Sequence, residues 1–137
     1  MNAAGTSPFS ASDAAARAEP IDPCIRMQGQ RVFKFASSSM ASAIEEVVAR
    51  GGMALDDVDL IVAHQANERI IRYAAKKIDK PLDLFQISIA NVGNTSASSV
   101  LVALCDAWGS GRVSPGDKVV LVGFGGGLTA GAVLFEA

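Results

Sequence analysis

The chain has 137 residues, 12 of them basic and 14 acidic, so its net charge of -2 does not indicate wholesale nucleic-acid binding. Hydrophobic residues make up 50% of the chain but aromatic residues only 6%, which is typical of tightly packed α/β layers in a single domain. No apolar run approaches the ~20 residues that span a membrane, and the N-terminus lacks the basic-then-apolar pattern of a secretory signal, so we expect a cytoplasmic protein.

The N-terminal segment, residues 1–24, is rich in Ala, Ser and Pro and has no sustained period. We interpret it as a flexible or partly ordered lead-in to one domain over residues 25–137. Within this domain, apolar residues recur at helical spacing over residues 30–50, and two glycines follow them. This pattern predicts the first helix.

The apolar run at residues 58–63 predicts the first strand. Asn67 is suited to cap a following helix that reaches about residue 79, and Pro81 cannot continue that helix. A second apolar run at residues 84–89 predicts the second strand.

The segment at residues 95–108 predicts a helix that carries no charge between Asn94 and Cys105. A helix that is apolar all round is buried all round. Residues 118–123 predict a central strand covered on both faces, and the strand at residues 128–135 follows too closely for a crossover, so it should pair antiparallel. Four strands cannot cover this helix on every side. Either the chain dimerises through the helix or it is one half of a larger protein, and we prefer the second interpretation.

His64 is the single histidine of the chain and directly follows the first predicted strand. Ligands bind at the carboxyl ends of strands in open α/β sheets. A lone histidine is also commonly a structural hydrogen-bonding residue, so both interpretations stay open at this point. The polar run from His64 to Asn67 favours a functional one, because a structural turn would favour Gly, Pro or Asp.

Asn94 follows the second predicted strand and Gly93. It is either the N-cap of the uncharged helix or an amide donor aimed into the same cleft as His64. Two neutral donors that converge on one point form an oxyanion hole, which stabilises an enolate or a tetrahedral oxyanion.

Two further patterns each allow two interpretations. The glycine-rich run at residues 123–127 is not a dinucleotide fingerprint, because a strand follows it; it is either a flexible hairpin connection or backbone brought close to a ligand. Basic residues lie at spacings of three, four and four on one helix face, which is either a solvated face or a docking patch for an acidic partner. These residues are Arg69, Arg72, Lys76 and Lys80.

Three motifs, in this order and spacing, resemble the C-terminal half of β-ketoacyl-acyl-carrier-protein synthase III, a condensing enzyme of the thiolase superfamily. The motifs are His64-Gln65-Ala66-Asn67, Gly93-Asn94-Thr95-Ser96-Ala97 and Gly123-Phe124-Gly125-Gly126-Gly127. A chalcone-synthase-like relative would be expected to carry Pro-Gly-Gly after the histidine and a proline in the last motif, and this chain has neither. The resemblance implies one half of a layered αβαβα thiolase-like fold, with a mixed sheet and a buried central helix.

The resemblance further implies an acyltransferase without a cofactor, which condenses acyl-CoA with malonyl carrier protein in fatty-acid biosynthesis. His64 and Asn94 would stabilise the enolate released by decarboxylation, and the backbone N–H of Gly126 would bind the acyl-enzyme carbonyl. The substrate-binding residues would be Phe33, Ala36, Asn67 and Phe124. The residues that dock the carrier protein would be Arg69, Arg72 and Lys76.

The nucleophilic cysteine of the family lies in an N-terminal half that this sequence lacks. Cys24 lies in the lead-in and Cys105 lies inside the uncharged helix, where a thiol is usually inert, so neither matches it. We therefore expect this chain to be inactive alone and the complete enzyme to be a homodimer that includes the N-terminal half. Two alternatives remain open: a non-catalytic subunit that binds acyl thioesters or carrier protein, and an acyltransferase with a non-malonyl acceptor.

Overall fold

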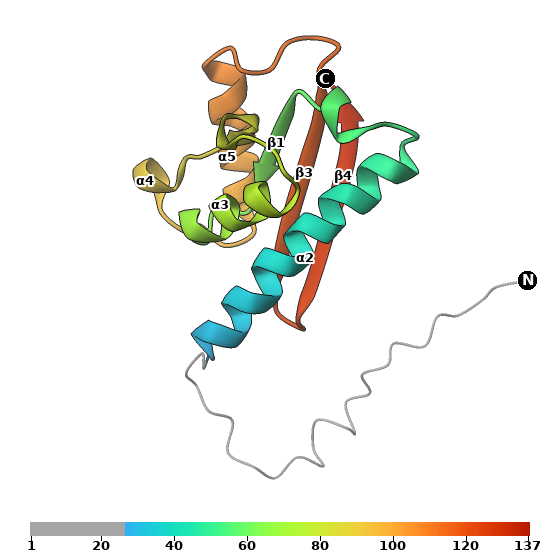
Figure 1. The fold of residues 1–137 in the computed structure, drawn as a ribbon. Coiled ribbons are helices and arrows are strands. Elements are labelled where there is room, and N and C mark those ends of the chain that lie inside the picture. Colours follow the sequence, from blue (N-terminus) through green and yellow to red (C-terminus); the bar gives the residue numbers. More distant parts are fainter. Residues whose placement is uncertain (1–26) are drawn as a thin grey trace, which may run out of the picture.

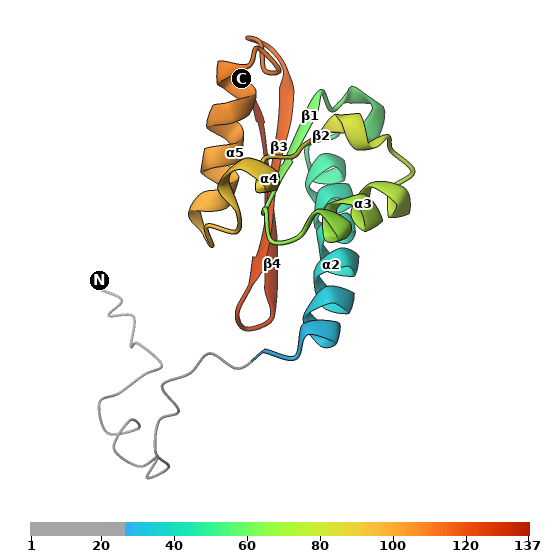
Figure 2. The same cartoon turned by 90° about the vertical axis from the view of Figure 1, so that its left-hand side faces the viewer.

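The computed structural model of the protein describes residues 27–137, so the predicted lead-in and Cys24 lie outside the described residues. The described part contains one four-stranded sheet with helices on both faces (Figures 1 and 2). In sheet order, the strands are β2 (Phe85–Gln86), β1 (Leu60–Ala63), β3 (Lys118–Gly125) and β4 (Thr129–Glu136). β1 pairs parallel with β2 and β3, whereas β3 and β4 pair antiparallel, which confirms the predicted antiparallel pairing of the last two strands.

The three main helices that the sequence predicts are all present. They are α2 (Gly29–Arg50), α3 (Glu68–Lys77) and α5 (Ser98–Gly109), and a short α4 (Ile89–Val92) lies before α5. Single 3₁₀ turns at Leu55–Asp57 and Leu82–Leu84 precede β1 and β2. Figure 2 shows α2 and α3 on one side of the sheet and α5 on the other.

Two predicted boundaries are wrong for identifiable reasons. The second strand has two residues rather than six, because the backbone N–H groups of Ser88 and Ile89 bond to the Gln65 side chain instead of continuing a sheet ladder. The last helix begins three residues later than predicted, because Ser96 has a φ of 56°, which no right-handed helix accommodates.

The core has two parts, one on each face of the sheet. On one face, α2 and α3 bury apolar side chains such as Met40 and Ile71 against Ile61 of β1. On the other face, Ala103 and Ala107 of α5 pack against the sheet in a smaller cluster.

The described residues bury only one face of the uncharged helix, which agrees with the expectation that four strands alone cannot cover it on every side. Ser99, Ala103 and Ala107 of α5 are buried, but Leu101 is 60% exposed and Trp108 is 49% exposed. Nothing in the described part of the chain covers this outer face. Within residues 27–137, no helix combines the length and apolar character needed to cross a membrane.

Candidate active site

His64 lies at the carboxyl end of β1, where its backbone N–H donates to the carbonyl of Val122 in β3 over 2.8 Å. This bond extends the sheet ladder by one residue and fixes the position of the imidazole. One side of the ring packs edge-on against Phe124, with 5.1 Å between ring centroids, and Nδ1 lies 2.5 Å from the Ser99 Oγ of α5. Burial lowers the pKa of His64 below its ordinary value of 6.5, so the imidazole is neutral at neutral pH.

Gln65, the next residue, points into the protein and is fully buried. Its Nε2 donates to the carbonyls of Ala63, at 2.8 Å, and of Gln86, at 3.0 Å. Its Oε1 accepts from the backbone N–H groups of Ser88, at 2.9 Å, and of Ile89, at 3.2 Å. The side chain thus joins the loop that carries His64 to the segment that leads through α4 to Asn94.

Asn94 lies in the loop between α4 and α5. Gly93 ends α4 with φ 67° and ψ −162°, a conformation that residues with a Cβ strongly disfavour. The Asn94 Oδ1 accepts from the backbone N–H of Ser96 over 3.1 Å, and the residue at the N-cap of α5 is Ala97. The N-cap interpretation of Asn94 is therefore wrong: its carbonyl oxygen stabilises a turn, and none of the hydrogen bonds found within residues 27–137 uses its amide nitrogen.

One cavity of about 590 Å³ brings His64 and Asn94 together, although 30 residues separate them in the sequence. The predicted site residues that also line this cavity are Phe33, Asn67, Phe124 and Gly126. Asn67 caps α3 as predicted, since its side chain accepts from the Arg69 backbone N–H over 2.9 Å. Ala36 does not line the cavity: it faces the sheet one turn along α2 from Phe33 and is fully buried in the core.

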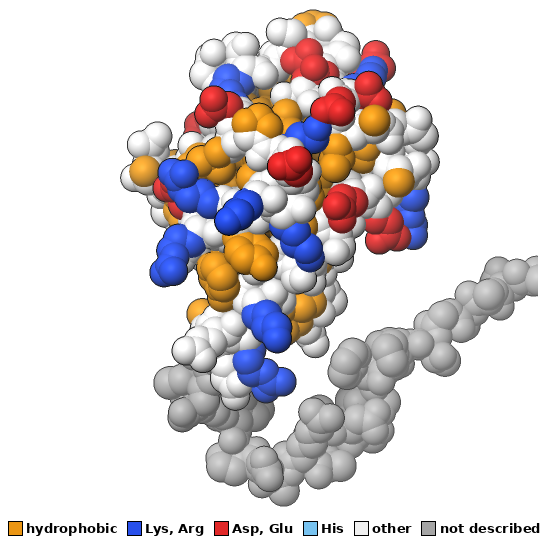
Figure 3. All heavy atoms as spheres, in the orientation of Figure 1, with side chains coloured by type: hydrophobic (Ala, Val, Ile, Leu, Met, Phe, Trp, Pro, Cys, Tyr) orange, Lys and Arg blue, Asp and Glu red, His pale blue; other side chains and the backbone are white. Residues whose placement is uncertain are grey.

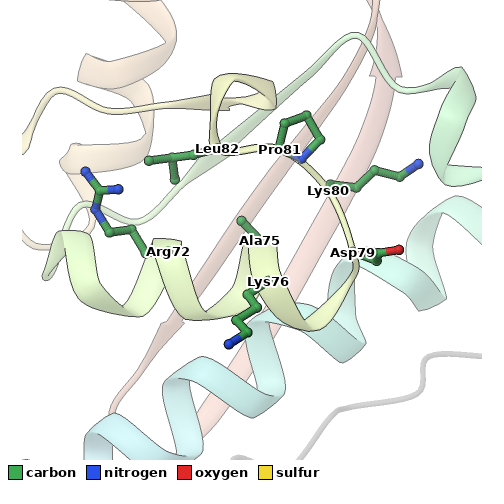
Figure 4. Close-up of a pocket in the computed structure, with 7 residues that line it drawn as sticks. All are labelled: Arg72, Ala75, Lys76, Asp79, Lys80, Pro81 and Leu82. Carbon is green, nitrogen blue, oxygen red and sulfur yellow. The ribbon is translucent and has the colours of Figure 1, made fainter.

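The predicted basic residues of α3 lie on the surface, where Lys and Arg side chains gather over α3 and the adjacent part of α2 (Figure 3). Arg69 lies beside the cavity-lining Phe33, with its guanidinium carbon 5.9 Å from the centre of the Phe33 ring. Arg72 forms an ion pair with Glu68 at 2.5 Å, and Lys80 pairs with Asp56. A second hollow of about 440 Å³ lies between α3 and the turn that follows it, with Arg72, Lys76 and Lys80 on its rim (Figure 4). Asp79 and the apolar residues Ala75, Pro81 and Leu82 also line this hollow.

Cys105, the free cysteine of the described residues, is exposed on α5 rather than buried as predicted, and it does not line the cavity with His64. Residues 27–137 contain no group of three or more His, Cys, Asp or Glu side chains that could hold a metal ion.

The sequence analysis did not predict the roles of two residues of the site, Gln65 as an inward-pointing side chain that joins two loops and Ser99 as the hydrogen-bond partner of His64. For Ser99, the spacing of residues along the helix could have indicated its position. It lies four residues before Ala103 and eight before Ala107, so it is the polar member of the stripe that α5 turns to the sheet.

The chain is similar to one family over most of the described region. Residues 48–137 match the family described as 3-oxoacyl-[acyl-carrier-protein (ACP)] synthase III C terminal. A beta-ketoacyl-[acyl-carrier-protein] synthase III from Clostridium perfringens is 42% identical over 112 residues, which are 82% of this chain and 35% of that protein. This chain therefore spans about a third of the length of the curated relatives it matches.

Solved structures give the same result for the fold. The crystal structure of 3-oxoacyl-[acyl-carrier-protein] synthase III from Aquifex aeolicus matches with a TM-score of 0.80 and 42% identity, over 82% of this chain and 37% of that one. The synthase III from Thermus thermophilus matches with a TM-score of 0.83 and 34% identity, over 98% of this chain and 40% of that one. The predicted α/β fold with a mixed sheet, as in one half of a thiolase-like protein, is confirmed.

Proposed function

The chain belongs to the 3-oxoacyl-[acyl-carrier-protein (ACP)] synthase III C-terminal family, and we propose that it is the C-terminal catalytic half of such a condensing enzyme in fatty-acid biosynthesis. In this proposal residues 25–137 form the half-domain, and a partner half supplies the nucleophilic cysteine. The complete enzyme is a homodimeric acyltransferase that uses acyl-CoA and malonyl carrier protein and needs no cofactor. This chain alone is then inactive.

The observation that carries the proposal is the convergence of His64 and Asn94 on one cavity. Both can donate a hydrogen bond without carrying charge, since burial lowers the pKa of His64 and its imidazole stays neutral. A thioester carbonyl oxygen that accepts from both donors becomes a better electron sink. This arrangement suits a reaction in which negative charge develops on that oxygen.

The step proposed for His64 and Asn94 is decarboxylation of a malonyl thioester. The bond between the carboxylate carbon and the methylene carbon breaks, carbon dioxide leaves, and the electron pair moves onto the thioester oxygen as an enolate. The methylene carbon of the enolate then attacks the carbonyl carbon of the acyl-cysteine. The tetrahedral oxyanion of that second step would accept from the backbone N–H of Gly126, and its collapse breaks the C–S bond to the cysteine.

The remaining site residues are assigned by their positions. Phe124, which packs against His64, would line the acyl pocket, and Phe33 and Asn67 would border the pantetheine path through the cavity. Exposed basic residues of α3 would dock the acidic carrier protein. These are Arg69, Arg72 and Lys76.

The test is carbon dioxide release from a malonyl thioester by the complete assembly. We expect His64→Ala and Asn94→Ala each to lower the rate about 10²–10³-fold, the usual cost of one oxyanion donor. Asn91→Ala is the matched control, because Asn91 is an exposed asparagine three residues away that does not line the cavity. Wild-type protein that binds the thioester but releases no carbon dioxide would contradict the proposal and favour a binding subunit, or an acyltransferase with a non-malonyl acceptor.

A further inference from the structure

Ser99 is a fully buried serine in the first turn of α5, and its hydroxyl group lies beside His64. Its Oγ lies 2.5 Å from the His64 Nδ1 and 3.2 Å from the backbone nitrogen of Gln65. Both contacts join α5 to the loop after β1, across about 35 residues of sequence. The hydroxyl is thus placed where it can determine which ring nitrogen of His64 carries a proton.

The hydrogen-bond partners of the Ser99 hydroxyl determine which of the two groups donates. The backbone N–H of Gln65 donates to the Ser99 Oγ and occupies one of its lone pairs. The hydroxyl proton of Ser99 needs an acceptor, because a buried donor without one loses its bond to water. Among the residues that the structure describes, the His64 Nδ1 is the acceptor within reach. Ser99 therefore donates to Nδ1, and a neutral imidazole that accepts at Nδ1 carries its own proton on Nε2.

We infer that Ser99 is a positioning residue that holds His64 as the Nε2–H tautomer, with the N–H available to a ligand in the cavity. If Nδ1 carried the proton instead, it would donate to the Ser99 Oγ, and the serine hydroxyl would be left without an acceptor in a fully buried place. The opposite tautomer therefore has a structural cost. The catalytic consequence of this inference rests on the proposed function, but the tautomer is a property of the fold.

His64 is the single histidine of the chain, so nitrogen NMR of the full-length protein reports its tautomer without assignment by mutation. We expect the wild-type spectrum at neutral pH to show a protonated, pyrrole-type Nε2 and an unprotonated, pyridine-type Nδ1. Ser99→Ala should shift both signals toward a mixture of tautomers. Ser99→Cys keeps a weaker donor without the extra methyl group that threonine would add at this buried position, and it should give an intermediate spectrum.

The matched control is Ser98→Ala. Ser98 is an exposed neighbour whose Oγ donates to the carbonyl of Thr95 over 2.7 Å, and its loss should leave the His64 signals unchanged. A wild-type spectrum with the proton on Nδ1 would overturn the inference, and this result needs no variant to fold. A folded Ser99→Ala protein with wild-type His64 signals would overturn it as well.

A kinetic measurement separates this inference from the proposed function. In the complete assembly, Ser99→Ala should lower kcat for malonyl-thioester decarboxylation about tenfold, which corresponds to one lost neutral hydrogen bond, and leave KM nearly unchanged. If the wild-type assembly releases no carbon dioxide, the proposed function fails while the NMR result still decides the tautomer. An unchanged kcat together with a shifted tautomer would show that Ser99 positions His64 without serving this reaction, and would overturn the catalytic part alone.

Discussion

Replacing Gln65 by leucine tests whether this one side chain holds the loop of His64 to the segment that leads to Asn94. Leucine has a similar volume but cannot bond to any of the four backbone groups that the glutamine amide contacts. Two of these groups, the N–H groups of Ser88 and Ile89, lie at the start of α4 and have Oε1 of Gln65 as their acceptor. The variant therefore removes the acceptor at the point where the chain turns toward Asn94.

The expected cost follows from the groups left without partners. A buried donor that loses its partner costs roughly 1–3 kcal/mol. Ser88 is buried and Ile89 is half-buried, so the second loss is partly offset by water. We expect Gln65→Leu to lower the free energy of unfolding by about 2–4 kcal/mol, a large part of the ~5–15 kcal/mol typical of a small protein.

Urea unfolding followed by circular dichroism measures this change. The matched control is Gln30→Leu, the same chemical change at an exposed position of α2, which should stay within about 0.5 kcal/mol of wild type. A loss below about 0.5 kcal/mol for Gln65→Leu would refute the reasoning. It would show that the two N–H groups find other partners and that Gln65 does not hold the loops together.

Two further predictions concern residues at the cavity. Gly93→Ala should destabilise the protein by about 1–3 kcal/mol in urea unfolding, because the φ of 67° at this residue is strained for any side chain. Its control is Gly109→Ala, at a helix end with open space around it, which should be neutral or stabilising. Below about pH 7 the unfolded chain binds more protons than the folded one, because burial lowers the pKa of His64 from 6.5. The free energy of unfolding should therefore fall as the pH drops through 6.5 toward the folded-state pKa, and His64→Gln should lose this part of the pH dependence. If the free energy of unfolding changed equally with pH in the wild type and in His64→Gln, the prediction would be contradicted.

The sequence was informative where a local pattern determines the local structure. The apolar run before His64 predicted a strand that delivers this side chain to the sheet edge, and Asn67 caps α3 as its position predicted. The site could not be completed in this way, because Gln65 and Ser99 act through partners 21 to 35 residues away. No local period reveals such a pair. For Asn94, the N-cap interpretation failed because the left-handed backbone at Ser96 separates it from the helix it would have capped.

The exposed side of α5 shows that a hydrophobicity pattern can predict that a helix is covered without showing what covers it. Its inner stripe consists of Ser99, Ala103 and Ala107, small side chains that let the helix approach the sheet closely. The larger Leu101 and Trp108 point outward and are exposed. Some larger side chains of α5 also pack on the inner cluster, but Leu101 and Trp108 leave apolar area on the outer side that burial would stabilise. Hydrophobicity therefore predicted that α5 is covered, but it carries no information on which polypeptide supplies the cover. Relatives of which this chain spans about a third have the additional length to supply it, and the proposed N-terminal half is the part we expect to lie there.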